Sequence, residues 1–156
     1  MQHFTISQPG PGVIAQAYPL VRMTAPEVTL EQWREHAGRL FATGGGILAV
    51  SAGDSSLLGL ATYRPEEDLR HGRVLRIDTI VTFELSHTSP ARQALCEGLD
   101  RLARELGCSA VTLTLDSRGY VEPACPKCES WLKLGLEPET VTLGKTLRKR
   151  RAAEVA

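Results

Sequence analysis

A strand that is followed by an amphipathic helix constrains the fold of this chain more than any other feature. Residues 73–81 (RVLRIDTIV) are rich in β-branched and aliphatic side chains, as in a mostly buried strand. Residues 90–107 repeat apolar side chains at helical spacing, with Ser89 as N-cap, Pro90 in the first helical position and Gly107 at the end. A helix in this position crosses over between parallel strands, so the pair predicts a partly parallel β-sheet.

The other segments extend this pair into a mixed sheet. The predicted strands are 3–7, 46–52, 56–64, 73–81, 110–116 and 140–147, and the predicted helices begin near Ile14 and at Thr29, span 90–107, and end within 131–136. Thr29 and Gln32 form a capping box, and residues 46–64 form a hairpin. The charged segment 65–72 is predicted to leave the sheet. We therefore expect an α/β fold with an antiparallel N-terminal part, a parallel pair at the crossover, and helices on both faces.

Composition limits the classes of protein to consider. The length of 156 residues and 42% apolar content fit one compact domain, predicted as residues 1–147, with a basic tail at 148–156. The formal net charge of zero predicts no overall attraction to nucleic acid or to a membrane surface. The absence of a membrane-length apolar run or signal-peptide core predicts a cytoplasmic protein with reduced thiols. The oligomeric state is left open, including a dimer.

Five fragments occur in a characteristic order along the chain. They are AYPLVRM (17–23), LLGLATYR (57–64), GRVLRIDTIVT (72–82), ARELGCSAVTLTLDS (103–117) and WLKLGLEPE (131–139). In this order and spacing they resemble the GCN5-related N-acetyltransferase (GNAT) superfamily, over about residues 11–147. The resemblance implies a sheet that splays between its fourth and fifth strands, acetyl-CoA as co-substrate, and a small-molecule or peptide amine as acceptor. It also implies that the pantetheine arm of acyl-CoA binds to backbone groups of Ile80, Val81 and Thr82.

The same resemblance places the CoA diphosphate at the turn before the 90–107 helix. The family loop reads (Q/R)-x-x-G-x-(G/A), and the matching positions here are His87, Thr88, Ser89, Pro90, Ala91 and Arg92. Pro90 has no N–H, and the loss of one hydrogen bond to a charged group weakens binding about 10- to 100-fold. The helix N-terminus, two hydroxyls and the His87 and Arg92 side chains can compensate. Alternatively, Ser89 and Pro90 only start the helix and His87 faces solvent.

The general acid of many relatives is also missing. A tyrosine in the family pattern FY-x-x-x-GF protonates the departing thiolate, and the corresponding residues are Ser130 and Trp131. An indole N–H does not fill that role, and Trp131 is most simply a packing residue. Tyr120, Ser130, Cys128 or water are the possible substitutes.

Asp78 is the candidate general base, because it is an acid within an otherwise apolar strand beside the expected cleft. Burial would raise its pKa toward the useful range. Arg76 lies two residues away on the same face, so a simple ion pair is the alternative. Glu66 and its acidic neighbours either attract a cationic acceptor or form a solvated loop.

The segment ACPKC contains Cys125 and Cys128, the spacing of half a zinc site or of a dithiol redox couple. A second matching pair is missing, so no metal ligand is predicted. The sequence thus supports an N-acyltransferase that works by direct attack in a ternary complex, with acetyl transfer as the first expectation. The alternatives are a non-catalytic module of the same fold, which binds a ligand or protein, and a thiol- or metal-responsive protein.

Overall fold

The structure is a computed structural model that describes residues 3–53, 56–83, 89–115 and 126–139. Its strands are β1 (Thr5–Ser7), β2 (Gly46–Ser51), β3 (Leu57–Asp68), β4 (Gly72–Thr82) and β5 (Ala110–Leu113). Its helices are the 3₁₀ helix η1 (Pro11–Ala17) and the α-helices α1 (Tyr18–Thr24), α2 (Leu30–Ala42), α3 (Pro90–Glu105) and α4 (Pro126–Lys133). The predicted strand at 140–147 and the predicted tail lie outside the described residues.

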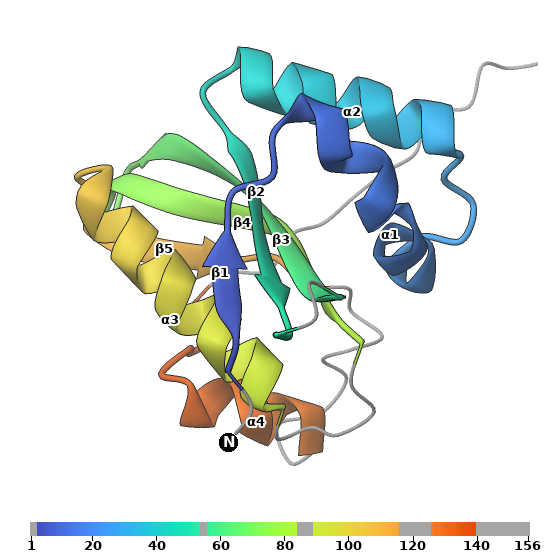
Figure 1. Cartoon of the computed structure of the whole chain (residues 1–156). Coiled ribbons are helices and arrows are strands. Elements are labelled where there is room, and N and C mark those ends of the chain that lie inside the picture. The colour runs from blue at the N-terminus through green and yellow to red at the C-terminus, as the bar shows by residue number, and fades with distance from the viewer. Residues whose placement is uncertain (1–2, 54–55, 84–88, 116–125, 140–156) are drawn as a thin grey trace, which may run out of the picture.

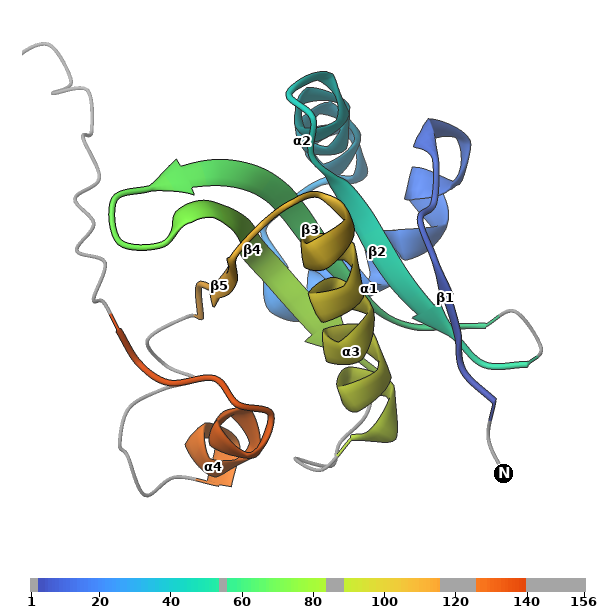
Figure 2. The ribbon, with the colours of Figure 1, turned by 90° about the vertical axis from the view of Figure 1, so that its left-hand side faces the viewer.

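The five strands form one sheet in sequence order. Strands β1 to β4 are antiparallel neighbours, and β5 runs parallel to β4 because α3 crosses over between them. Helices α1 and α2 cover one face of the sheet and α3 covers the other (Figures 1 and 2). The predicted α/β class, mixed sheet and two-sided helical cover are confirmed.

Each face of the sheet has its own core. On the α3 face, residues such as Leu75, Ile77 and Leu95 are almost completely buried. On the other face, Trp33 of α2 is buried, and its Nε1 donates a hydrogen bond to the carbonyl oxygen of Ile14 at 2.9 Å. In the described part of the chain, no helix is both long and apolar enough to cross a bilayer.

The predicted helix starts are confirmed in detail. Thr29 Oγ1 accepts a hydrogen bond from the Gln32 N–H at 3.1 Å, and Gln32 Oε1 accepts one from the Thr29 N–H at 2.9 Å. At α3, Ser89 Oγ accepts from the Arg92 N–H at 3.0 Å. Both helices therefore begin where side-chain oxygens satisfy their first free N–H groups.

The charged segment 65–72 does not leave the sheet as predicted. Strand β3 runs on to Asp68, and β4 begins at Gly72, so the segment forms the end of a long hairpin. Asp68 Oδ1 accepts hydrogen bonds from the N–H groups of His71 at 3.0 Å and Arg70 at 2.7 Å, which hold the pKa of Asp68 below its usual range. Gly72 follows with a φ of 75°, a backbone conformation that glycine adopts without strain.

Pro65 is tolerated inside β3 because of where β2 begins. The last pair between these strands is Gly46 with Tyr63, so beyond Tyr63 strand β3 has β4 as its one neighbour in the described residues. A proline on the open edge of a strand costs no ladder hydrogen bond.

Candidate active site

Strands β4 and β5 separate part-way along β4. Their pairing runs from Val74 with Ala110 to Ile77 with Leu113, and the Thr114 N–H then donates to the Ile77 carbonyl oxygen at 3.0 Å. Beyond Ile77, strand β4 continues to Thr82 with no partner on this side among the described residues (Figure 2). This divergence leaves an open edge on β4.

A β-bulge lies at the start of the divergence. Thr62 pairs with Thr79 and Tyr63 pairs with Ile77, so Asp78 is the extra residue on β4. The bulge shifts the alternation of side chains by one residue. As a result Ile77 and Ile80 both pack on the α3 face, although they are three residues apart.

The bulge also decides which backbone groups face the open edge. The Phe83 N–H donates to the Leu58 carbonyl oxygen of β3 at 2.6 Å. Because backbone groups alternate along an antiparallel pair, Val81 also directs its backbone toward β3, whereas Ile80 and Thr82 direct theirs toward the divergence. Of the three residues predicted to bind pantetheine through their backbone, Ile80 and Thr82 thus face the open edge. The Val81 side chain packs against the core under α1 and α2.

Thr82 adds a polar side chain at this place. The residue is 7% exposed, and its Oγ1 is buried without a hydrogen-bond partner in the part of the chain that the structure describes. Buried hydroxyls in proteins normally have a partner. A ligand with amide groups can bind both this hydroxyl and the backbone groups of Ile80 and Thr82, so the residues present fit a pantetheine arm.

The first turn of α3 lies after β4 in the chain. Ser89 is buried, and its hydroxyl oxygen is already used as the helix cap. Ala91 is fully buried in the core, so its predicted contribution to a cofactor site is limited to its backbone. His87 and Thr88 lie outside the described residues.

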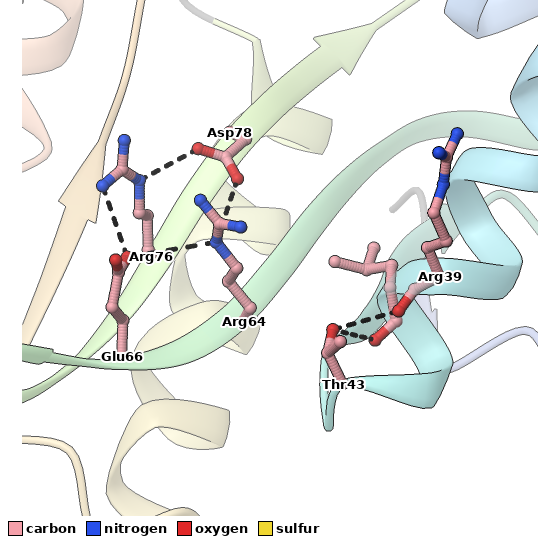
Figure 3. Close-up of polar contacts among 7 residues, drawn as sticks. Arg39, Thr43, Arg64, Glu66, Arg76 and Asp78 are labelled. Atoms are coloured by element: carbon pink, nitrogen blue, oxygen red, sulfur yellow. Dashed lines mark hydrogen bonds and ion pairs between the residues drawn. The ribbon is translucent and has the colours of Figure 1, made fainter.

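On the opposite face of the sheet, four charged side chains form a closed ring of ion pairs (Figure 3). The pairs are Arg76–Asp78 at 3.1 Å, Arg76–Glu66 at 3.3 Å, Arg64–Asp78 at 3.4 Å and Arg64–Glu66 at 3.9 Å. Arg76 Nε donates a hydrogen bond to Asp78 Oδ1, whereas Arg64 Nε approaches Asp78 Oδ2 as an ion pair without hydrogen-bond alignment. The hydrogen bond to Asp78 raises the pKa of the Arg76 guanidinium above its usual range.

Solved structures of other proteins share this architecture. AAC(6')-Iy, an aminoglycoside N-acetyltransferase in complex with CoA, superposes with a TM-score of 0.78 at 14% identity, covering 96% of this chain and 97% of that one. Glucosamine-6-phosphate N-acetyltransferase from Arabidopsis thaliana gives 0.66 at 15% identity over 94% and 99%. A transcriptional regulator from Bacillus halodurans C-125 gives 0.73 at 15% identity over 93% and 100%.

The chain has the GNAT fold. At these identities the likeness defines the architecture and leaves the activity open. No protein-family model and no curated protein sequence matches the chain.

Ser130 and Trp131, the residues that the sequence analysis compared with the tyrosine of many GNAT proteins, lie against α3. Ser130 and Trp131 of α4 are 7% and 8% exposed. Arg92 Nη1 donates to Ser130 Oγ at 3.3 Å, and the guanidinium carbon of Arg92 lies 4.7 Å from the centre of the Trp131 ring, a cation–π contact. Sequence reasoning assigned Arg92 to the diphosphate and Trp131 to packing, but the two are in contact. No local signal predicted this, because the residues belong to different helices.

The structure places Asp78 at the surface of the GNAT fold rather than in a buried cleft. About a third of its side chain is exposed, and two arginines contact it. The predicted Arg76 contact is present, and Arg64 is a partner that the sequence analysis did not identify. Asp78 nevertheless lies at the bulge where β4 leaves β5, so it stays a candidate for proton transfer at the divergence.

The predicted cysteine pair and one substitute acid are not described. Cys125, Tyr120 and the side chain of Cys128 lie outside the described residues. Within the described ranges, no group of three or more histidine, cysteine or acidic side chains lies close enough together to hold a metal ion.

Proposed function

We propose that this protein is an N-acyltransferase that moves an acyl group, acetyl in the first instance, from acyl-CoA to a small-molecule or peptide amine in a ternary complex. The observation that supports this most is the divergence of β4 and β5 at Ile77, with the backbone groups of Ile80 and Thr82 facing the open edge. The structural neighbour AAC(6')-Iy binds CoA and also a CoA-containing bisubstrate analogue. A similar arrangement of donor and acceptor is proposed here.

In this proposal, backbone groups of Ile80 and Thr82 and the Thr82 hydroxyl bind the pantetheine arm. The N-terminus of α3 attracts the diphosphate through the helix dipole and the backbone N–H of Ala91, because Pro90 has no N–H and the Arg92 N–H already binds Ser89 Oγ. Arg92 adds a positive charge in the first turn of that helix. His87 and Thr88 precede this helix in the sequence, and their side chains are the remaining groups proposed to bind the diphosphate.

The chemistry requires a neutral amine at the thioester carbonyl. The amine nitrogen forms the new C–N bond, the C–S bond breaks, and the sulfur leaves as a thiolate. Asp78 accepts the proton that the amine loses. The transfer runs through a water molecule, because the Asp78 side chain is in the ion-pair ring on the face of the sheet opposite α3. A thiol pKa of about 8.5 makes the thiolate a tolerable leaving group, so Ser130 or water suffices as the proton donor.

The second candidate is a non-catalytic module of the same fold. The contact of Arg92 with Trp131 and Ser130 favours it, because a phosphate has to compete with these partners for the guanidinium. Pro90 favours it too, since this residue removes one N–H from the turn. A module of this kind would bind CoA weakly or not at all.

Calorimetric titration with CoA separates the two candidates. We expect a Kd for CoA in the micromolar range and not below it, because Pro90 lacks an N–H that could bind the diphosphate. At a CoA concentration one hundred times the Kd, the free energy of unfolding should rise by about 2.7 kcal/mol, which a thermal melt detects as a higher Tm. If acetyl-CoA released heat but no CoA thioester raised the Tm, the binding would not be at a specific site. A sub-micromolar Kd would contradict the proposal that the turn before α3 binds the diphosphate weakly.

The Arg92→Ala variant tests the proposed diphosphate contact. Loss of one charge-assisted contact should weaken CoA binding roughly 10- to 100-fold. Arg101→Ala is the matched control, because Arg101 lies on the exposed side of the same helix. Equal affinities for both variants would show that Arg92 serves only to hold α4.

A further inference from the structure

A cavity lies where β4 and β5 part, on the α3 side of the sheet. Its volume is about 420 Å³. Ile77 and Ile80 of β4 form one wall, Leu99 of α3 another, and Leu134 beyond α4 a third. Ile77 is the last residue of β4 with a partner on β5, and Ile80 directs its backbone toward the divergence. The cavity and the proposed thioester site therefore share a wall.

The lining of this cavity combines aliphatic side chains, among them Ile77 and Ile80 beside the divergence, with polar residues such as Ser109. Its charged members, Asp100 and Arg104, both belong to the exposed side of α3 and lie at the rim. Cys96 also lines the cavity, and burial raises the pKa of its thiol to about 11. The aliphatic part of the cavity, beside the divergence, favours hydrocarbon over a sugar, a phosphate or a charged acceptor.

The cavity is larger than an acetyl group requires. Its volume falls in the range of sites that bury drug-sized ligands. A two-carbon acyl group would leave most of it empty, whereas a longer saturated chain would fill it. Because Ile80 belongs both to the cavity and to the proposed thioester site, such a chain would begin next to the cavity.

We propose that this cavity receives the acyl chain of the donor, so that the preferred co-substrate is a short- to medium-chain acyl-CoA rather than acetyl-CoA. This inference rests on the proposed function, since it assumes that the thioester lies in the divergence of β4 and β5. The chain would lie on the α3 side of the sheet, and the acceptor would approach from the side that carries Asp78.

The test is a binding series with acetyl-, butyryl-, hexanoyl- and octanoyl-CoA on the full chain, read by calorimetry and by the shift in Tm. Each buried methylene should tighten binding about fourfold until the cavity is full. Hexanoyl-CoA should therefore bind at least tenfold more tightly than acetyl-CoA. Equal affinities along the series would overturn the inference and leave the proposed function intact, whereas no binding by any thioester would overturn both.

Two variants at one position locate the chain. Cys96→Phe places a ring in the cavity and should abolish the preference for longer chains while acetyl-CoA still binds. Cys96→Ser is the matched control, because it changes the volume little and should keep the preference. If Cys96→Phe does not fold, Ala103→Leu fills the same cavity from the next turns of α3. A chain-length preference that survives in a folded cavity-filling variant would place the chain elsewhere and overturn the inference.

Discussion

Asp78 has two structural properties that bear on its role. It is the extra residue of the bulge on β4, and its carboxylate contacts both arginines of the ion-pair ring. The ring alone would explain why an acid is present. The position at the end of the β4–β5 pairing is what connects this acid with the proposed reaction.

Replacement of Asp78 by asparagine should separate the two roles. If Asp78 accepts the proton, Asp78→Asn should lower turnover about 10²- to 10⁴-fold. Stability should change by less than about 1 kcal/mol, because exposed ion pairs contribute little. Both quantities follow from steady-state kinetics and a denaturant titration.

Glu66→Gln provides the control for this experiment. Glu66 contacts the same two arginines at 3.9 and 3.3 Å and is similarly exposed, but it lies on β3, away from the divergence. Similar turnover in both variants would assign Asp78 to the ring and remove it from the mechanism.

Cys96 should be slow to react with alkylating reagents. With a thiol pKa of about 11, the thiolate is rare at pH 8, so iodoacetamide should modify Cys96 about a hundredfold more slowly than an ordinary free cysteine. The rate should rise with pH up to about 11. Peptide mass spectrometry after timed alkylation measures this rate.

The raised pKa of Cys96 also makes the stability of the protein depend on pH. The folded state keeps the Cys96 proton to a higher pH than the unfolded state does, so between about pH 9 and pH 11 stability falls as pH rises. Alkylation of Cys96 at an ordinary rate at pH 8 would show that the cavity wall is more open than the structure indicates.

Among the elements, the β3–β4 hairpin determines the shape of the site. Gly59 lies opposite Thr82, and a Cβ at residue 59 would lie 2.8 Å from both the Val81 carbonyl oxygen and Thr82 Cγ2. Gly59→Ala should therefore push these residues away and destabilise the protein by about 1–3 kcal/mol. Urea denaturation measures this loss in the free energy of unfolding as a lower midpoint with an unchanged m value.

Gly38→Ala is the control for this substitution. Gly38 is exposed within α2. Among the described residues, no atom outside the adjoining backbone of that helix lies within 4 Å of the place that a methyl group would take. This variant should gain about 0.5–1 kcal/mol, because alanine favours helix. A gain in both variants would mean that β3 and β4 are not in close contact at Gly59.

Much of the fold was predictable because its signals are local. The caps of α2 and α3 and the apolar runs of β2 and β4 each lie within a few residues. The end of the β3–β4 hairpin was missed because its exposed polar residues lack the alternation of a half-buried strand. The sequence feature that could have revealed this end of the hairpin is the turn between Asp68 and Gly72.

Much of the site depends on contacts that a single sequence does not specify. The bulge at Asp78 arises from the register between two strands, and a shift of one residue changes which side chains share a face. Arg64 reaches Asp78 across the hairpin, and Arg92 reaches Trp131 between two helices. These contacts join residues far apart in the sequence.

In the molecule as a whole, β5 is a weakly protected strand at one end of the described sheet. All its residues are only partly buried, whereas β2 is almost completely buried between β1 and β3. Amide hydrogens of β5 should therefore exchange faster than those of β2. A CoA thioester bound in the divergence should slow exchange in β5 and leave β2 unchanged, as hydrogen-exchange mass spectrometry can measure. Equal slowing in both strands would indicate global stabilisation instead of local binding.

The two tryptophans of the chain lie in separate places, Trp33 on the buried side of α2 and Trp131 against α3. A Trp33→Phe protein would thus carry a single indole fluorophore, in contact with the guanidinium of Arg92. Its emission would report the polarity at the junction of α3 and α4, so ligand arrival at this end of the molecule becomes visible without any attached dye.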